Sequence, residues 1–467
     1  MFLKKRVRRS PVLPWSLAAG VANAEPAISI TPAGGTLIDE PLSIVVRGLE
    51  SGAQVSVKAR LVDDRGIAWT SEALVYADND GIVDLTSAAS TGGTYQGVDA
   101  SGLLWSMMPV TPDELDTYRK EMPKHPERTA APTFDEPGES ELRIWAERNG
   151  RELATTLYHQ RRIAADVEVR AVRDGRLRGV LYRPKGGSGS RPALIWMMGS
   201  GGSVDSRYAP LLASRGYTVL ALGYFGYADL PAASHNLPIE YVGEALDWMA
   251  RETGRSRTVV VGMSRGTEAA LLTGSFYPDK VAGVVAYAPS HVVNNGIDDK
   301  GNVAVPNWTW QGKPLPFAQA SFPDAATWLK MGAEKPYMGT PIYLSAWNNP
   351  GADERYGIPV ERIAAPILLI SGSGDDLWPS AIGGDRIVAR LKAKNFRYPY
   401  RHYRAPGAGH LFTPPNFVST MSDWTFLRAI FVSTGGTPAL NAAASRQAWS
   451  ELLRFLGQVD GAKRKSR

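Results

Sequence analysis

The segment VVVGMSRGTE, residues 259–268, decides how the fold of this chain is interpreted. Its apolar half predicts a buried strand, and the residues that follow, TEAALLTGSF (267–276), predict a helix. Between them, Gly262-x-Ser264-x-Gly266 has the spacing of a nucleophile elbow, a sharp strand-to-helix turn that exposes a serine hydroxyl. A serine between glycines is also an ordinary helix N-cap. A catalytic role therefore requires a base, an acid and a suitable fold.

Apolar runs of the same kind recur on both sides of this segment. They are ALIWMMG (193–199), YTVLALGYF (217–225), AGVVAYAP (282–289), PILLISG (366–372) and RYPYRHYRA (397–405), with a helical pattern at 239–253. Continuous apolar strands that alternate with helices are typical of a mostly parallel sheet covered on both faces. We therefore expect an α/β-hydrolase domain over residues 166–460. Residues 291–358 are irregular and predict a loop-rich insertion near the mouth of a site.

The N-terminal part of the chain has a different pattern. In QVSVKARL (54–61), apolar residues alternate with polar ones, as in a strand with one buried face. Similar runs lie at 42–49, 68–78, 141–148 and 152–160, and turn-forming clusters separate the early ones. Short strands at this spacing predict an immunoglobulin-like β-sandwich over residues 27–165. The stretch 110–138, rich in proline and charge, is interpreted as an excursion within the sandwich.

Composition excludes several classes of protein. The 467 residues are enough for two domains and include no cysteine, so disulfides, thiolate metal sites and a cysteine nucleophile are excluded. The net charge of +6 comes from basic residues near the two ends, within 4–9 and 463–467, and the remainder of the chain is slightly acidic. A nucleic-acid partner is therefore not expected. No stretch is long and apolar enough to predict a membrane span.

The N-terminus resembles a secretory signal peptide. Basic KKRVRR (4–9) precedes PVLPWSLAAGVANA (11–24), which ends in the small-x-small pattern Ala22-Asn23-Ala24. We expect residues 1–24 to be removed and the protein to be periplasmic or secreted. The alternative is a cytoplasmic protein with a basic leader. Residues 461–467 form a basic tail.

The base is expected to be His410. In an α/β-hydrolase the order along the chain is serine, acid, histidine, with the histidine on the loop after the last strand. The six histidines are His125, His159, His235, His291, His402 and His410. The first three precede the serine, the fourth precedes any late-strand acid, and the fifth lies within a strand pattern. Only His410, in APGAGHLF, follows the last strand.

The acid and the oxyanion hole are expected on two other loops. GSGDDLWPS follows the strand PILLISG and offers Asp375 and Asp376, between which the local pattern does not decide. The glycine-rich turn MMGSGGS (197–203) follows an early strand, where an oxyanion hole takes one of its backbone N–H donors. We expect Ser200 or Gly201 to supply that donor, and Arg265, the residue after the serine, to supply the other. Glu268, in the first helical turn, suits the helix dipole.

Taken together, these motifs resemble the acyl-CoA thioesterase and bile acid-CoA:amino acid N-acyltransferase family. The resemblance runs from about residue 28 to residue 430. It is carried by DEPLSIVVRGL, ADNDGIVDL and GTYQGVDASGLLWSM in the first domain and by LLASRGYTVLALGYFGYADLP, GMSRGTE, IPVERIAAPILLISGSGDDLWPS and YRAPGAGHLFTPP in the second. The resemblance implies a Ser264–Asp375–His410 triad. The transferases of the family use cysteine as nucleophile, so a serine implies a hydrolase.

We therefore expect a serine hydrolase that cleaves acyl thioesters through an acyl-enzyme, with no cofactor and no metal. The expected partner is a small-molecule acyl thioester or ester. An exported carboxylesterase or dienelactone-type hydrolase is the alternative, because a signal peptide would separate the enzyme from cytosolic acyl-CoA. An acyl-CoA:amino acid N-acyltransferase and an inactive binding protein are the less favoured alternatives.

Overall fold

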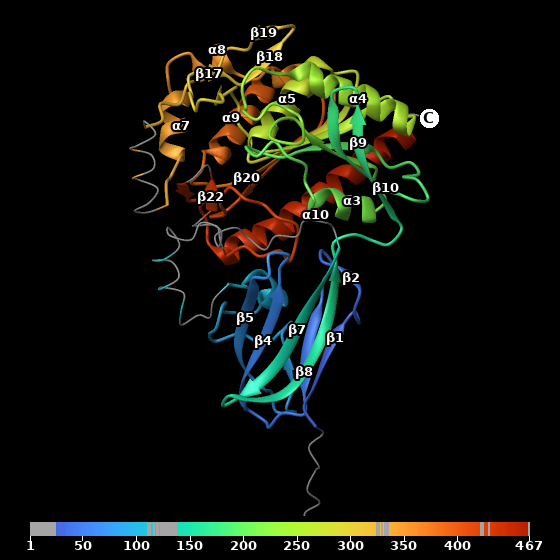
Figure 1. The fold of residues 1–467 in the computed structure, drawn as a ribbon, viewed down its shortest axis with the longest axis vertical. Coiled ribbons are helices and arrows are strands. Elements are labelled where there is room, and N and C mark those ends of the chain that lie inside the picture. The colour runs from blue at the N-terminus through green and yellow to red at the C-terminus, as the bar shows by residue number, and fades with distance from the viewer. Residues whose placement is uncertain are drawn as a thin grey trace, which may run out of the picture.

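The computed structural model describes residues 25–109, 138–323, 336–420, 425–427 and 430–465, with a few isolated positions between them. A β-sandwich forms the lower part of the molecule and an α/β domain forms the upper part (Figure 1). The predicted signal peptide (1–24), most of the predicted excursion (110–138) and the side chains of the predicted basic tail (461–467) lie outside the described residues.

Two facing sheets make up the sandwich. In spatial order, the first contains β1 (Ala27–Thr31), β3 (Ser43–Arg47) and β6 (Val83–Asp84), and the second contains β2 (Thr36–Leu37), β8 (Arg151–Arg161), β7 (Glu139–Arg148), β4 (Gln54–Val62) and β5 (Ala68–Tyr76). The alternation along β4 buries Val55, Val57 and Ala59 in one core with Trp69 of β5 and Ile44 of β3. A short helix, α1 (Gly102–Trp105), packs on the same core. The predicted sandwich is confirmed.

An eight-stranded sheet forms the centre of the α/β domain. In spatial order it contains β21 (Tyr400–Ala405), β20 (Ile367–Gly372), β15 (Val281–Tyr287), β14 (Thr258–Met263), β11 (Ala193–Met197), β12 (Val219–Gly223), β10 (Leu177–Pro184) and β9 (Val167–Asp174). The pairs from β21 to β12 are parallel, whereas β10 is antiparallel to both of its neighbours. Every residue of β11, β12, β14, β15 and β20 is buried, which explains their continuous apolar sequences.

Strands β9 and β10 were not predicted from the sequence. Their sequences, VEVRAVRD and LRGVLYRP, carry several arginines, and most side chains of β9 are exposed. Strand β9 lies at the edge of the sheet and β10 next to it, and neither has the continuous apolar run that marks a strand buried on both faces. The predicted parallel sheet therefore gains an antiparallel edge.

Helices cover both faces of this sheet, as predicted. The helices are α3 (Tyr208–Ser214), α4 (Ile239–Thr253), α5 (Arg265–Phe276), α9 (Ser380–Ala393) and α10 (Pro438–Lys465). Helices α4, α5 and α9 share one core with the sheet, and α3 and α10 share the other. Figure 1 shows α3 and α10 on the side of the sheet that faces the sandwich. Among the described residues, no helix has the length and apolar character needed to cross a membrane.

The predicted insertion, residues 291–358, consists largely of short elements and connecting loops. It holds β16 (Asn295–Gly296), β17 (Val305–Pro306), β18 (Trp308–Trp310), β19 (Lys313–Pro314), α7 (Thr340–Trp347) and α8 (Ala352–Tyr356), and η4 (Val360–Arg362) follows it. Strand β18 pairs with β13 (Leu237–Pro238), just before α4. The insertion thus rests on the loop that follows β12.

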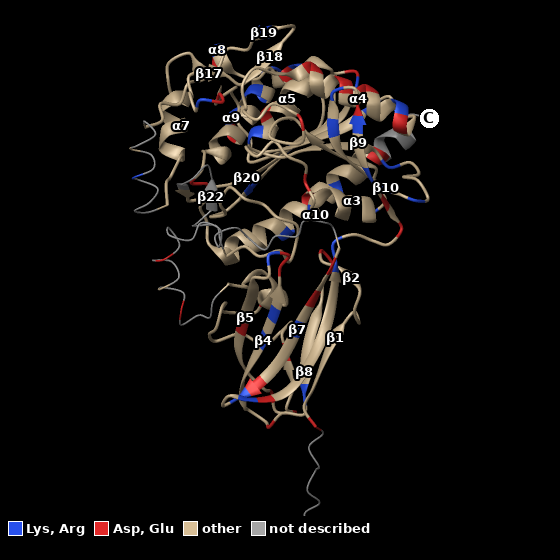
Figure 2. Cartoon of the chain, in the orientation of Figure 1, with Lys and Arg blue, Asp and Glu red and all other residues tan. Residues whose placement is uncertain are grey.

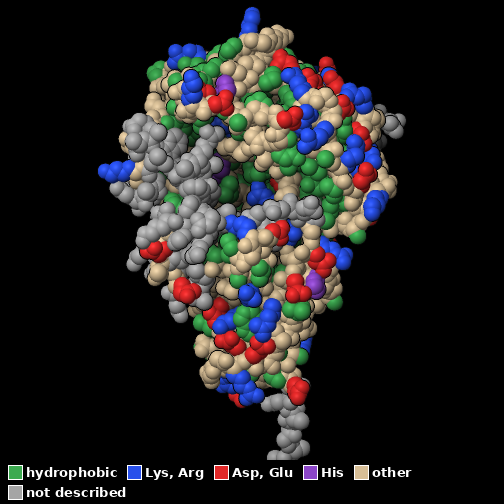
Figure 3. Space-filling view, viewed as in Figure 1, with side chains coloured by type: hydrophobic (Ala, Val, Ile, Leu, Met, Phe, Trp, Pro, Cys, Tyr) green, Lys and Arg blue, Asp and Glu red, His purple; other side chains and the backbone are tan. Residues whose placement is uncertain are grey.

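Polar contacts join the two domains. Asp39 of the sandwich lies buried and accepts hydrogen bonds from Arg215 and from the Trp449 indole of α10. Arg446, also on α10, donates to Asp99 at 2.8 Å. Lys and Arg residues are interspersed with Asp and Glu residues along both domains (Figure 2). The face drawn in Figure 3 shows the same mixture beside hydrophobic side chains.

Candidate active site

Ser264 occupies a strained turn between β14 and α5. Its backbone has φ 52° and ψ −122°, a conformation that residues with a side chain rarely adopt. The strand and helix approach each other closely here, because a Cβ on Gly262 would lie 2.0 Å from the carbonyl oxygen of Gly266. The elbow therefore depends on the glycines of its motif and directs a fixed, nearly buried serine away from the end of the strand.

Three side chains from three loops form a hydrogen-bonded chain at the carboxyl ends of the strands. His410, on the loop after β21, has Nε2 2.8 Å from Ser264 Oγ and Nδ1 2.8 Å from Asp375 Oδ2. The histidine is 1% exposed and Asp375 is 6% exposed. Such an arrangement allows a histidine to remove the serine proton while the carboxylate orients the ring and stabilises its cationic form.

The structure pairs Asp375, rather than Asp376, with His410. Asp375 Oδ1 accepts hydrogen bonds from the backbone N–H groups of Leu377 and Trp378. Its Oδ2, which faces the histidine, also accepts a 2.6 Å hydrogen bond from Ser380 Oγ. Asp376 instead accepts a hydrogen bond from Ser433, so the ambiguity left by the local pattern is resolved by geometry.

The loop after β11 lies beside the serine. A Cβ on Gly199 would be 2.9 Å from the Cβ of Ser264, so the loop backbone lies directly against the Ser264 side chain. Ser200 and Arg265 line the same cavity as Ser264, whereas Gly201 is exposed. Ser200 and Arg265 thus lie beside Ser264, and the oxyanion-hole role expected of Ser200, Gly201 and Arg265 stays a prediction.

Tyr224, which the sequence interpretation missed, supports this loop from behind. Its hydroxyl donates to the carbonyl oxygens of Met198, at 2.6 Å, and Gly199, at 2.9 Å. Burial raises the pKa of this phenol, so it keeps the proton that these hydrogen bonds need. Within an apolar strand pattern, nothing in the sequence distinguishes this tyrosine from a core aromatic residue.

The cavity at Ser264 has apolar walls and a volume of about 60 Å³. Its walls are Ile297, Phe322, Tyr337, Tyr343, Leu377, Trp378 and Val432. Four of these side chains come from the insertion, which therefore forms one side of the site, as its predicted place near the mouth suggests. The Trp378 ring also meets the His410 ring edge to face, with centroids 5.7 Å apart. The cavity suits an apolar group next to Ser264.

Glu268 does more than complement the helix dipole. The side chain is fully buried, and its carboxylate accepts hydrogen bonds from Asn294 Nδ2 and Trp308 Nε1, each at 2.9 Å, and from the Asn294 backbone N–H. Burial raises the pKa of this carboxyl, and the Arg265 guanidinium and the hydrogen bonds oppose that change. Through these hydrogen bonds Glu268 connects the insertion to α5, the helix that begins directly after Ser264.

A metal centre finds no support in the described part of the chain. No three His, Asp or Glu side chains there converge in a way that would hold a metal ion. The hydrogen-bonded chain of Ser264, His410 and Asp375 is instead suited to nucleophilic chemistry by a serine.

Comparisons with known proteins agree with the motifs. The model of the acyl-CoA thioester hydrolase/BAAT N-terminal region matches residues 39–174, and that of the BAAT/acyl-CoA thioester hydrolase C-terminal region matches residues 237–461. The chain is 30% identical to acyl-coenzyme A thioesterase 1 of Rattus norvegicus over 94% of this chain and 98% of the relative. It is 29% identical to mitochondrial acyl-coenzyme A thioesterase 2 of Mus musculus over 95% of this chain and 91% of the relative.

Solved structures of hydrolases are also similar to this chain. A putative dienelactone hydrolase from Klebsiella pneumoniae matches with a TM-score of 0.36 and 15% identity, covering 62% of this chain and 98% of that one. An esterase/lipase from an uncultured bacterium matches with a TM-score of 0.37 and 16% identity, covering 64% of this chain and 87% of that one.

Proposed function

Because this chain belongs to the acyl-CoA thioester hydrolase/BAAT family, we propose that it is a serine hydrolase that cleaves acyl thioesters through an acyl-enzyme. The observation that carries the proposal is the chain of 2.8 Å contacts from Ser264 through His410 to Asp375. The relatives named acyl-coenzyme A thioesterases support a thioester as the substrate.

Acylation begins at Ser264 Oγ. His410 Nε2 takes the hydroxyl proton as the oxygen attacks the acyl carbonyl carbon. The backbone N–H groups of Arg265 and Ser200 stabilise the oxyanion that forms, and the N-terminus of α5 adds partial positive charge. When the carbon–sulfur bond breaks, His410 gives its proton to the sulfur. The thiol departs, and the acyl group remains on Ser264 as an ester.

Deacylation repeats these steps with water. His410 removes a proton from a water molecule, whose oxygen attacks the ester carbonyl of the acyl-enzyme. The oxyanion is stabilised by the same N–H groups, and the proton on His410 returns to Ser264 Oγ as the carboxylic acid leaves. Asp375 orients the His410 ring in both steps, and the hydrogen bonds that Leu377, Trp378 and Ser380 donate to its oxygens hold it in place.

The apolar walls support an acyl group as the part of the substrate bound next to Ser264. Tyr343, Leu377 and Trp378 offer carbon surface and exclude water from the reacting carbonyl. Exclusion of water strengthens the hydrogen bonds that stabilise the oxyanion.

The second candidate is an exported carboxylesterase. It is favoured by the signal-peptide pattern at residues 1–24, which implies a compartment without cytosolic acyl-CoA. The same triad and the same apolar cavity would cleave an oxyester, so the two candidates differ in the leaving group.

Substrate preference distinguishes these candidates. We would measure kcat/KM of the chain from Glu25 onward for acyl-CoA thioesters of increasing length and for p-nitrophenyl esters of the same acids. A strong preference for CoA thioesters supports the thioesterase. Rapid ester cleavage with CoA thioesters left intact supports the esterase, and an amide product on addition of glycine or taurine would identify a transferase instead.

A further inference from the structure

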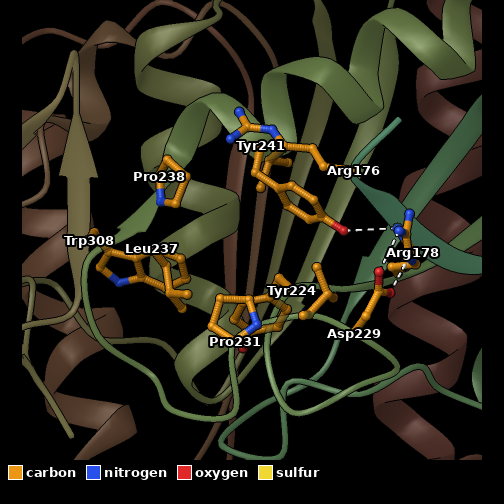
Figure 4. Close-up of a pocket in the computed structure, with 11 residues that line it drawn as sticks. Arg176, Arg178, Tyr224, Asp229, Pro231, Leu237, Pro238, Tyr241 and Trp308 are labelled. Atoms are coloured by element: carbon orange, nitrogen blue, oxygen red, sulfur yellow. Dashed lines mark hydrogen bonds and ion pairs between the residues drawn. The ribbon is translucent and has the colours of Figure 1, made fainter. Parts of the chain in front are cut away.

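A second cavity, with a volume of about 270 Å³, is lined by Tyr224 and Trp308, neither of which lines the cavity at Ser264. Figure 4 shows it between the start of β10, the loop after β12 and the first turn of α4. None of the proposed catalytic residues lines it. Its volume is near the lower end of the range typical of small-molecule sites.

The interior of this cavity is apolar. Leu237, Val242 and Trp308 present buried carbon surface. The two tyrosines of its wall turn their hydroxyls to the backbone: Tyr224 donates to the loop after β11, and Tyr241 donates to Gly223 O at 2.8 Å. Their rings therefore face the cavity as hydrophobic surface, and an occupant has to be largely apolar.

Two arginines at the mouth differ in how well they are satisfied. Arg178 binds Asp229 with two nitrogens and donates to two backbone carbonyl oxygens with a third. The Arg176 guanidinium pairs with Glu244, at 2.7 and 2.6 Å, and lies over the Tyr241 ring, 5.9 Å from its centroid. The Arg176 and Glu244 side chains are 52% and 47% exposed. Because both side chains are exposed, Glu244 can turn into solvent and leave its place on the guanidinium to an incoming carboxylate.

We propose that this cavity binds a monocarboxylic acid with an apolar chain. The chain lies against Tyr224, Leu237 and Trp308, and the carboxylate pairs with the Arg176 guanidinium at the mouth. A planar guanidinium matches a carboxylate with two parallel hydrogen bonds. The site is separate from the proposed catalytic cavity and does not depend on the proposed reaction.

The walls of this cavity connect it to the nucleophile. Tyr224 holds the carbonyl groups of Met198 and Gly199, next to Ser264, and its ring stacks on Trp308 with centroids 5.8 Å apart. The Trp308 indole in turn donates to Glu268, in the first turn of the nucleophile helix. A bound acid thus touches two rings whose polar ends support the proposed active site.

Photocrosslinking tests the proposal. The full chain carrying Ser264→Ala is irradiated with octanoate that bears a diazirine at the chain end, and labelled peptides are identified by mass spectrometry. We expect label within residues 224–242 or on Trp308. Arg176→Ala should lower this labelling about threefold, the effect of losing an exposed ion pair. Glu244→Gln should raise it, because the competing carboxylate is gone.

Arg251→Ala is the matched control and should leave labelling unchanged. It removes an exposed arginine from the last turn of α4, the helix that also carries Glu244. Label confined to residues of the Ser264 cavity, such as Tyr343, would overturn the proposal. Equal labelling of the Arg176→Ala and Arg251→Ala proteins would also overturn it, as would equal labelling by the corresponding diazirine alcohol, which has no carboxylate.

Discussion

The α/β domain contains two buried histidines, each of which contacts an aspartate. His410 Nδ1 lies 2.8 Å from Asp375, and His291 Nε2 lies 3.0 Å from Asp353. Each imidazole also meets a tryptophan ring edge to face, Trp378 for the first and Trp347 for the second. By residue type and distance, the two pairs are nearly the same.

Their surroundings differ. Asp375 is buried and accepts three further hydrogen bonds, whereas Asp353 is 53% exposed on its side chain and is shared with Arg386. The second ring nitrogen of His410 meets Ser264 on its strained turn. The second ring nitrogen of His291 is buried and meets no hydrogen-bonding partner among the described residues. A His–Asp pair therefore becomes a candidate catalytic site only where a fold element presents a third reacting group.

The largest effect should separate the two histidines. His410→Ala removes the base that activates Ser264, so we expect kcat/KM for the preferred acyl substrate to fall by about 10⁶-fold. His291→Ala should leave kcat/KM within a few-fold of the unaltered protein. Circular dichroism at the assay temperature controls for folding. Comparable losses of kcat/KM in the two variants would contradict the assignment of His410 as the base.

Substitution of Asp375 should lower kcat far more than substitution of Asp353. Asp375→Asn no longer holds His410 in the tautomer that can accept the serine proton, so we expect kcat to fall by about 10⁴-fold. Asp353→Asn alters a partly exposed side chain and should leave kcat unchanged. Steady-state kinetics measures both, and Asp376→Asn, next to the proposed acid, is a second control. A full loss of activity in Asp376→Asn would contradict the assignment.

The features of the fold and of the candidate site differ in how far the sequence predicts them. Residues 239–253 were predicted as a helix with the bounds that the structure gives to α4, because their apolar positions recur at helical spacing. Ser264 and His410 follow from motif and chain order. Asp375 was chosen over Asp376 by the family resemblance, because the local pattern left both open. Two features needed tertiary structure: the burial of Glu268 and the insertion residues that wall the cavity. Local pattern records neither of these, since a buried acid in a first turn looks like an exposed one.

The acid sensitivity of folding should come in part from His291. Burial lowers its pKa to about 4, Arg386 acts in the same direction, and Asp353 opposes them. The unfolded chain, with a pKa near 6.5, therefore binds more protons between pH 6.5 and 4, so the free energy of unfolding falls as pH falls through this window. We expect a loss of up to about 3 kcal/mol from this group. Above pH 6.5 the group has no effect.

Urea denaturation at a series of pH values measures this loss. His291→Gln should flatten the pH dependence between pH 6.5 and 4, whatever its effect at neutral pH. Burial also lowers the pKa of His402, which is still present in this variant. The free energy of unfolding should therefore still depend on pH, with a smaller slope than in the unaltered protein. An unchanged slope in His291→Gln would show that the histidine does not titrate as its burial requires.

The smallest effect concerns Glu268, which Asn294 connects to the surroundings of His291. Asn294 binds Glu268 on one side and accepts from the Trp347 indole, which touches His291, on the other. Glu268→Gln replaces a carboxylate oxygen by an N–H donor that faces other donors, so we expect a loss of about 2 kcal/mol in stability. Urea denaturation measures it at pH 7. Glu240→Gln, at the start of α4, is a control of the same chemistry, and an equal loss there would contradict the role of Glu268.

The claim that Ser264 is the nucleophile is tested most directly by trapping the acyl-enzyme. The protein is mixed with the acyl-CoA that it cleaves fastest, quenched in acid within the first turnover, digested and analysed by mass spectrometry. We predict one acyl group on the peptide that contains Ser264, and none on that peptide in Ser264→Ala. Turnover without any adduct at Ser264, or an adduct on another residue that persists in Ser264→Ala, would contradict the account.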